Sequence, residues 1–208
     1  MLHASQVHTV IAPMRTARAH HTALRLPNGD VVVTGGTTLT GPTVEVERFS
    51  LAKQQWVTLA RKERALSGQL TAALDNGHML LVGGAQEGDA SNHVERFDPV
   101  HITWTTVRPL NDARFSHTAT SLWGGAGKVL VVGGNRLKGG VGTVLDTVEL
   151  YTADSDSWTR LGALSQARMN HSACGSCRYL RRRTNWGLIW APSSPSTSSI
   201  AFRTGSSA

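Results

Sequence analysis

The sequence of 208 residues has little of what marks several common classes of protein. It contains only two cysteines, Cys174 and Cys177. They do not indicate the cellular compartment, and they supply only half of the ligands of a structural zinc site. Its apolar runs are all shorter than a membrane span, and residues 1–13 lack the charged start and long apolar core of a secretory signal. We therefore expect no membrane partner and no zinc bound at the cysteines.

Motifs for nucleotide binding and catalysis are missing as well. Gly127-Lys128 is followed by Val129, so the sequence of a phosphate-binding P-loop is not met, and there is no Gly-x-Ser-x-Gly elbow. The glycines at 139–142 lack the following helix that would help to bind an anion. We expect no catalytic, cofactor-binding or metal-ligating residue and no cofactor.

Acidic residues are absent from the C-terminal end, and this explains most of the net charge of +7. Five arginines follow Cys174 without a single acid, namely Arg178, Arg181, Arg182, Arg183 and Arg203. Residues 1–173 hold 16 basic and 14 acidic residues, a net charge of only +2. Because the net charge of this larger part is close to zero, we expect no nucleic acid partner and no groove that binds one.

What the sequence does contain is an internal repeat of three units. An apolar run ends in twin glycines that begin at Gly35, Gly83 and Gly133, which are 48 and 50 residues apart. A Glu-x-aromatic follows each time, and a tryptophan stands seven positions after the aromatic. The members are Glu47, Phe49 and Trp56; Glu95, Phe97 and Trp104; and Glu149, Tyr151 and Trp158. A period near fifty with twin glycines is typical of one β-propeller blade per unit.

Within each unit, four apolar or alternating runs of four to eight residues predict four strands. Asn28-Gly29 and Asn76-Gly77 predict tight turns between the first two strands, and glycines at 124–127 do the same in the third unit. The run before each Gly-Gly is apolar on both faces, as in a strand covered on both sides. We expect the twin glycines to adopt backbone angles that a Cβ atom would resist.

The Gly-Gly, the Glu before Phe or Tyr, and the Trp resemble the kelch motif, over residues 14–174. The resemblance implies an all-β fold, an incomplete kelch-type β-propeller of about three four-stranded antiparallel blades with the opening of a fourth. Residues 1–13 are expected to be the end of a preceding blade or irregular. Because a propeller ring has four to eight blades, we interpret the chain as a truncated fragment whose open edges could self-associate.

Residues that recur in every unit are expected to be architectural, since a catalytic group is needed once. We expect Glu47, Glu95 and Glu149 to be structural and to need partners, because an unpaired buried charge is costly. Their candidate partners are Arg18, Arg114 and Arg168; unit two departs, with Leu66 and Gln69 at the matching positions and Arg64 displaced by two. His21, His117 and His171 are likewise expected to be structural rather than metal ligands. His20 is unrepeated, and on a strand it would point away from His21.

The pattern breaks after residue 174, where the next apolar run and Gly-Gly should follow. Residues 175–208 are instead a basic tail rich in serine and arginine, expected to be irregular and disordered. The abrupt change suggests the hypothesis of a reading-frame shift in the coding sequence. The alternative is a basic arm in which Arg181, Arg182 and Arg183 contact a phosphate or a partner.

For function, the sequence favours a non-catalytic binding or scaffold module. The partner, a protein or other ligand, would be held by the loops after each Gly-Gly, which differ between units: Thr37 to Thr43, Ala85 to His93 and Asn135 to Asp146. The alternative is a fragment of a propeller enzyme that resembles the copper radical oxidases. That family's site requires two tyrosines, two histidines and a cysteine; here Tyr151 is the repeat aromatic and Tyr179 lies in the tail, so the set is absent.

Overall fold

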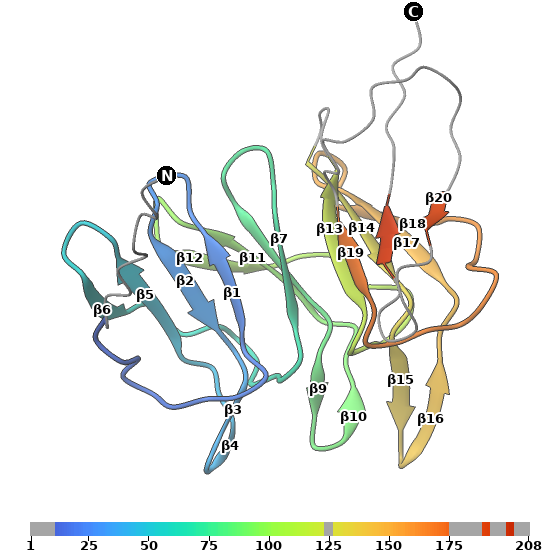
Figure 1. Cartoon of the computed structure of the whole chain (residues 1–208), viewed down its shortest axis with the longest axis horizontal. Helices are drawn as coiled ribbons and strands as arrows, with labels where there is room; N and C mark the ends of the chain where they lie inside the picture. Colours follow the sequence, from blue (N-terminus) through green and yellow to red (C-terminus); the bar gives the residue numbers. More distant parts are fainter. Residues whose placement is uncertain (1–10, 123–126, 175–188, 192–198, 202–208) are drawn as a thin grey trace, which may run out of the picture.

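The computed structural model describes residues 11–122, 127–174, 189–191 and 199–201. All regular elements in these residues are β-strands, and they include no helix that could cross a membrane. Three four-stranded sheets lie side by side in chain order, one for each sequence unit (Figure 1). The predicted all-β class, with four strands in each unit, is confirmed.

We call the sheets blades 1, 2 and 3, and each is antiparallel throughout. The strands of blade 1, in spatial order, are β1 (Thr22–Arg25), β2 (Val31–Thr34), β5 (Val46–Ser50) and β6 (Gln55–Thr58). Those of blade 2 are β7 (Leu70–Ala73), β8 (Met79–Val82), β11 (Val94–Asp98) and β12 (Thr103–Thr106). Those of blade 3 are β13 (Thr118–Leu122), β14 (Lys128–Val132), β17 (Val148–Thr152) and β18 (Ser157–Arg160).

The turns between the first two strands lie where Asn-Gly predicts them. Gly29 and Gly77 have φ of 91° and 81°, and the preceding asparagine does not share this left-handed conformation. Instead, the side-chain oxygen of each asparagine accepts the backbone N–H two residues later, at Asp30 and at His78. The glycine therefore supplies the backbone angle and the asparagine supplies the acceptor.

The twin glycines end the second strand as expected. In blade 2, Gly83 and Gly84 have φ of 63° and 106°, and the other two pairs also have positive φ. A Cβ on Gly83 would lie 2.5 Å from the carbonyl oxygen of Arg114, which begins the next unit. Both the angles and the close approach of the neighbouring backbone therefore exclude a side chain here, and the prediction is confirmed.

Each predicted loop after Gly-Gly forms a two-stranded hairpin, which the sequence pattern did not indicate. The hairpins are β3 (Thr37–Thr38) with β4 (Gly41–Pro42), β9 (Ala85–Gln86) with β10 (Asp89–Ala90), and β15 (Asn135–Lys138) with β16 (Val141–Val144). The carbonyl of the second glycine accepts an N–H at the base of each hairpin, as Gly84 does from Ser91. All three project from the same edge of the blades (Figure 1).

The core lies between the faces of neighbouring blades, as β8 shows. Met79 packs toward blade 1 in a cluster with Leu26, Val32 and Phe97. Leu80 and Val82 lie in a second cluster that includes blade 3 residues. Because consecutive strand residues point to opposite faces, one short strand contributes to two interfaces. Each such side chain contributes about 1.5–3 kcal/mol by burial.

The repeated aromatic and tryptophan stand opposite each other on the third and fourth strands. Their ring centroids are 5.3 Å apart in blade 1, 4.7 Å in blade 2 and 5.0 Å in blade 3. Each indole N–H donates to a backbone carbonyl in the segment before its blade, at Ala12, Ala60 and Arg108 respectively. The tryptophan thus joins the outer strand to the preceding connection in all three blades.

After blade 3, β19 (Ser172–Cys174) lies beside β13, as β13 lies beside β7. Its partner is a parallel strand, β21 (Ser199–Ala201), which pairs antiparallel with β20 (Ile189–Ala191). The predicted opening of a fourth unit therefore has its first strand. The rest of the predicted tail, including Arg178, Arg181–Arg183 and Arg203, lies outside the described residues.

Candidate functional site

Each blade buries one glutamate completely at the start of its third strand: Glu47, Glu95 and Glu149. In blade 1 the backbone N–H groups of Arg15 and Thr16 donate to the carboxylate, at 2.7 and 3.1 Å. In blade 3 the N–H groups at positions 111 and 112 do the same, at 2.8 and 3.1 Å. The acid therefore ties its blade to the segment before it, and its structural use is confirmed in these two blades.

An arginine completes the site in blades 1 and 3. The Arg18 guanidinium lies 2.8 Å from Glu47, and that of Arg114 lies 2.5 Å from Glu149. Both arginines also donate to the carbonyl of the first twin glycine, Gly35 or Gly133. Burial lowers the pKa of Arg114, while attraction to Glu149 opposes that change. The predicted pairing is confirmed in these two blades.

Blade 2 differs at this site, because buried Leu66 stands at the arginine position. Lys62, four residues earlier, occupies the position of Leu110 in blade 3: their N–H groups donate to equivalent carbonyls, of Val44 and Asn92. The Lys62 side chain is buried, and its ammonium donates to the Arg64 carbonyl. Burial lowers the pKa of Lys62 to about 8, and the charge of Glu95 opposes that change. Relative to blade 3, the buried cation and the buried leucine of blade 2 have therefore exchanged positions. Arg64 is exposed.

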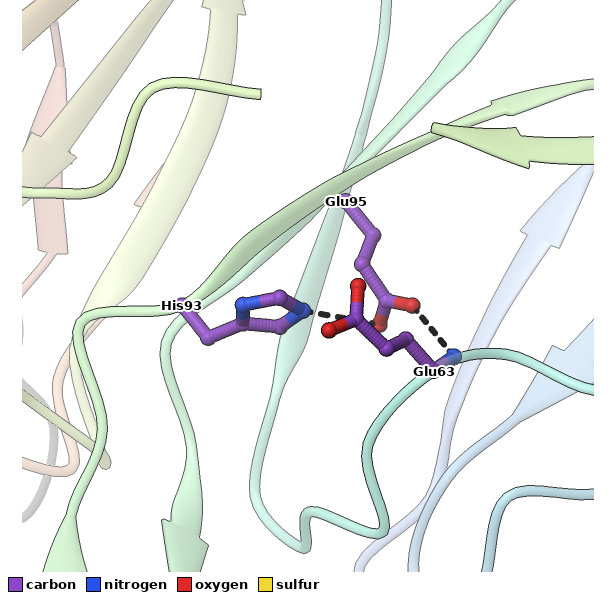
Figure 2. A group of neighbouring side chains, drawn as sticks. All are labelled: Glu63, His93 and Glu95. Atoms are coloured by element: carbon purple, nitrogen blue, oxygen red, sulfur yellow. Dashed lines mark hydrogen bonds and ion pairs between the residues drawn. The ribbon is translucent and has the colours of Figure 1, made fainter. Parts of the chain in front are cut away.

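Without the arginine, Glu95 collects a different set of neighbours (Figure 2). The Glu63 N–H donates to Glu95 Oε1 at 2.7 Å, and His93 Nε2 lies 3.7 Å from Glu95 Oε2. One ligand atom from each of Glu63, His93 and Glu95 lies within 4.8 Å of the other two. The hydroxyl of Thr106 donates to the Glu63 carboxylate and, together with His93, lowers the pKa of Glu63.

Sequence reasoning did not single out Glu63 or His93. The signal was present in the differences between units: position 63 corresponds to Arg15 and Asn111, whose N–H groups bind the acids of the other blades. Position 93 stands two residues before the buried acid, where the other units have Glu45 and Thr147. Attention to what does not recur would have indicated both residues.

The repeated histidines lie in different surroundings. His117 is buried, and desolvation, with the charges of Arg114 and His171, lowers its pKa to about 3. His171 Nε2 lies 3.1 Å from the Thr118 hydroxyl, and His21 is exposed. Within the described ranges, these three histidines belong to no group with metal-ligand spacing. A neutral His117 is therefore a packing residue at neutral pH.

His20 does not lie on a strand, so it does not form the expected pair of opposite faces with His21. It precedes β1, is exposed and has φ of 52°. The equivalent residues Gly68, Ser116 and Asn170 also have positive φ, between 53° and 62°. A left-handed bend therefore recurs before the first strand of every unit, and only unit two marks it with glycine.

The three hairpins form the second candidate surface. Leu39, at the tip of the first, is fully exposed, and Val141 on β16 is 72% exposed. The Gly139 N–H donates to Asp89 at 2.8 Å, which joins the second hairpin to the third. A groove of about 750 Å³ lies between these two, lined by polar residues such as Arg64, Glu87 and Asn92 and by Leu66 and Leu137. The face thus combines exposed apolar tips with a polar groove.

The residues considered for copper radical chemistry do not come together in the described part of the chain. The Tyr151 hydroxyl donates to Asp156 at 2.9 Å inside the core, where burial and Asp156 raise its pKa. Tyr179 and Cys177 lie outside the described residues. Tyr151 is thus occupied as the aromatic of its blade.

Comparison with known proteins agrees with this geometry. Residues 68–111, which contain the four strands of blade 2, match the family described as the Kelch motif. No curated protein matches the chain. Blades 1 and 3 repeat the strand order, glycines, buried acid and aromatic pair of the matched blade. Blade 2 therefore carries a Kelch motif, and blades 1 and 3 have the same blade architecture.

Proposed function

We propose that this chain is a non-catalytic kelch module that binds another protein on the face formed by its three hairpins. The observation that carries the proposal is the exposure of apolar side chains on that face. Among the described residues, Leu39 is fully exposed, and Val141 and Val144 on β16 are 72% and 41% exposed. Apolar residues gathered on projecting loops, with polar residues between them, are typical of protein-binding surfaces.

The backbone hydrogen bonds at the base of each hairpin support the same function. Two backbone hydrogen bonds join Ala19 to Thr37 at the first hairpin, and equivalent pairs join Ser67 to Ala85 and Phe115 to Asn135. Each hairpin is thus anchored at its base to the segment before the blade. An interface held in advance loses less conformational entropy on binding than a mobile loop does.

The groove between the second and third hairpins supplies groups for specificity. Arg64, Glu87 and Asp89 place charges of both signs around Leu66 and Leu137. Mixed charge suits the polar groups of a peptide chain better than the uniform negative charge of a nucleic acid. We therefore expect a protein segment with an apolar side chain as the occupant.

The test compares affinity capture by the parent chain with capture by the double variant L39D/V141D. The two aspartates should abolish capture of the specific partners that mass spectrometry identifies, because burying an unpaired carboxylate in the interface is costly. The matched control is L51D/V100D. These residues are 53% and 80% exposed, in turns at the opposite edge of blades 1 and 2. Equal loss in both variants, or in neither, would contradict the proposal. Light scattering of the parent chain shows whether the partner is a second copy.

A further inference from the structure

We infer that Glu63, His93 and Glu95 form a binding site for one divalent transition-metal ion, with Zn²⁺ as the representative ion. The first argument is an unmet need for positive charge. In blades 1 and 3 the buried carboxylate contacts a guanidinium at 2.8 and 2.5 Å. In blade 2 that position is Leu66, and the Lys62 ammonium donates instead to a backbone carbonyl. A dication would supply what the arginine supplies elsewhere.

The second argument is that two buried ligand atoms lack hydrogen-bond partners. Glu95 Oε2 and His93 Nε2 are buried, and neither makes a hydrogen bond within the described residues. Their side chains are 0% and 8% exposed, and the two atoms face each other at 3.7 Å. Buried polar atoms without partners are rare, because each costs about 1–3 kcal/mol. An ion between these atoms would satisfy both.

The third argument is the chemistry and spacing of the ligand set. One imidazole and two carboxylates suit Zn²⁺ and similar first-row ions. The three ligand atoms lie within 4.8 Å of one another. Ligands about 2.0–2.2 Å from a common ion lie up to about 4.4 Å apart, so only a small contraction is required. Glu63 is exposed and can supply it, while the Thr106 hydroxyl orients its carboxylate. Figure 2 shows the side chains of Glu63 and His93 directed toward Glu95.

The fourth argument is that this set occurs only once in the repeat. Glu95 has a counterpart in every blade, but Glu63 corresponds to Arg15 and Asn111, and His93 to Glu45 and Thr147. A packing device is needed in every blade, whereas a ligand site is needed once. The residues that distinguish blade 2 are those that a metal ion requires.

Lys62 is the internal competitor, since the attraction of Glu95 acts on its buried ammonium. Blade 3 has Leu110 at this position, so K62L introduces a side chain that the equivalent position of another blade already holds. Removing the ammonium should tighten metal binding and increase the rise in Tm that Zn²⁺ produces.

The experiment measures Zn²⁺ binding by calorimetry and by the shift in Tm. Every sample carries C174S/C177S, so that thiolates do not contribute. We expect one Zn²⁺ per chain, with binding at least about tenfold weaker in H93T and in E63N. Both variants carry the residue of blade 3, and their unfolding without metal serves as the check that they fold. The control H101Q changes an exposed histidine that lies 2.7 Å from Asp98 in the same blade, and it should bind like the parent.

Two results would overturn the inference. One is the absence of Zn²⁺ binding to both the parent and K62L. The other is binding that persists unchanged in H93T and E63N, or that is lost in H101Q, since the ion would then lie elsewhere on the surface.

Discussion

Blades 2 and 3 bury the same glutamate at the same place, but they carry their buried cation at different positions in the chain. In blade 3 the cation is Arg114, and Leu110 fills the apolar position four residues before it. In blade 2 the order is reversed, with Lys62 first and Leu66 second, and both are buried. The cation contacts the acid directly in blade 3, whereas in blade 2 the Lys62 ammonium donates to the Arg64 carbonyl. The fold therefore accepts a buried cation at either position, but it pairs that cation with the acid only in blade 3.

The largest expected effect comes from removing the cation of blade 3. R114L would leave Glu149 buried with only the N–H groups at 111 and 112 and the Asn111 amide as donors. We expect the free energy of unfolding to fall by about 3–5 kcal/mol, because the variant strands a buried charge. Urea unfolding at pH 7 measures this change.

The double variant L110K/R114L gives blade 3 the arrangement of blade 2. If the two blades are interchangeable at this site, the added lysine recovers part of the loss caused by R114L. The reciprocal variant K62L/L66R should be milder than K62L alone. A double variant no more stable than R114L would show that the lysine works only in the surroundings of blade 2.

Of the two cation positions, in blades 2 and 3, the sequence could predict only the one in blade 3. The acid, the aromatic and the tryptophan recur at constant spacing from one another after each Gly-Gly, so the blades and the pairs Arg18–Glu47 and Arg114–Glu149 could be predicted. The burial of Lys62 near Glu95 could not be predicted, because the lysine stands at a position that is apolar in blade 3. The contact between positions 63 and 93 could not be predicted either, because it joins residues 30 positions apart. The fold creates it when the connection before the blade folds back onto β11.

The hairpins after Gly-Gly were missed for a different reason. β3 and β9 are only two residues long, and β16 has no buried side chain, so no apolar alternation marks these strands. Their pairing depends on the backbone at their base, where the second glycine and the segment before the blade supply hydrogen bonds. Such contacts leave no pattern in side-chain chemistry.

Blades 2 and 3 should also differ in how their stability depends on pH, because buried Gln69 of blade 2 stands at the position of buried His117 in blade 3. The pKa of His117 is lowered from 6.5 to about 3. Between these values the unfolded chain binds a proton that the folded chain does not, so stability is full above pH 6.5 and falls as pH decreases. The loss reaches about 2 kcal/mol at pH 5. H117Q should remove that part of the loss between pH 7 and pH 5 in urea unfolding, and Q69H should add a similar dependence. Identical pH profiles for H117Q and the parent would show that His117 takes up its proton in the folded state.

The smallest expected effect concerns a feature that all three blades share. W56F, W104F and W158F each remove one indole hydrogen bond to a backbone carbonyl and shorten a ring that packs on its aromatic partner. Each substitution should cost about 1–2 kcal/mol, from one hydrogen bond and the lost apolar area. Urea unfolding of the three variants under one condition gives the comparison. Equal losses would confine the difference between blades to the acid site, because the outer strands would then be energetically equivalent. A markedly larger loss in W104F would instead show that blade 2, with its exchanged cation, depends more on its outer strand than its neighbours do.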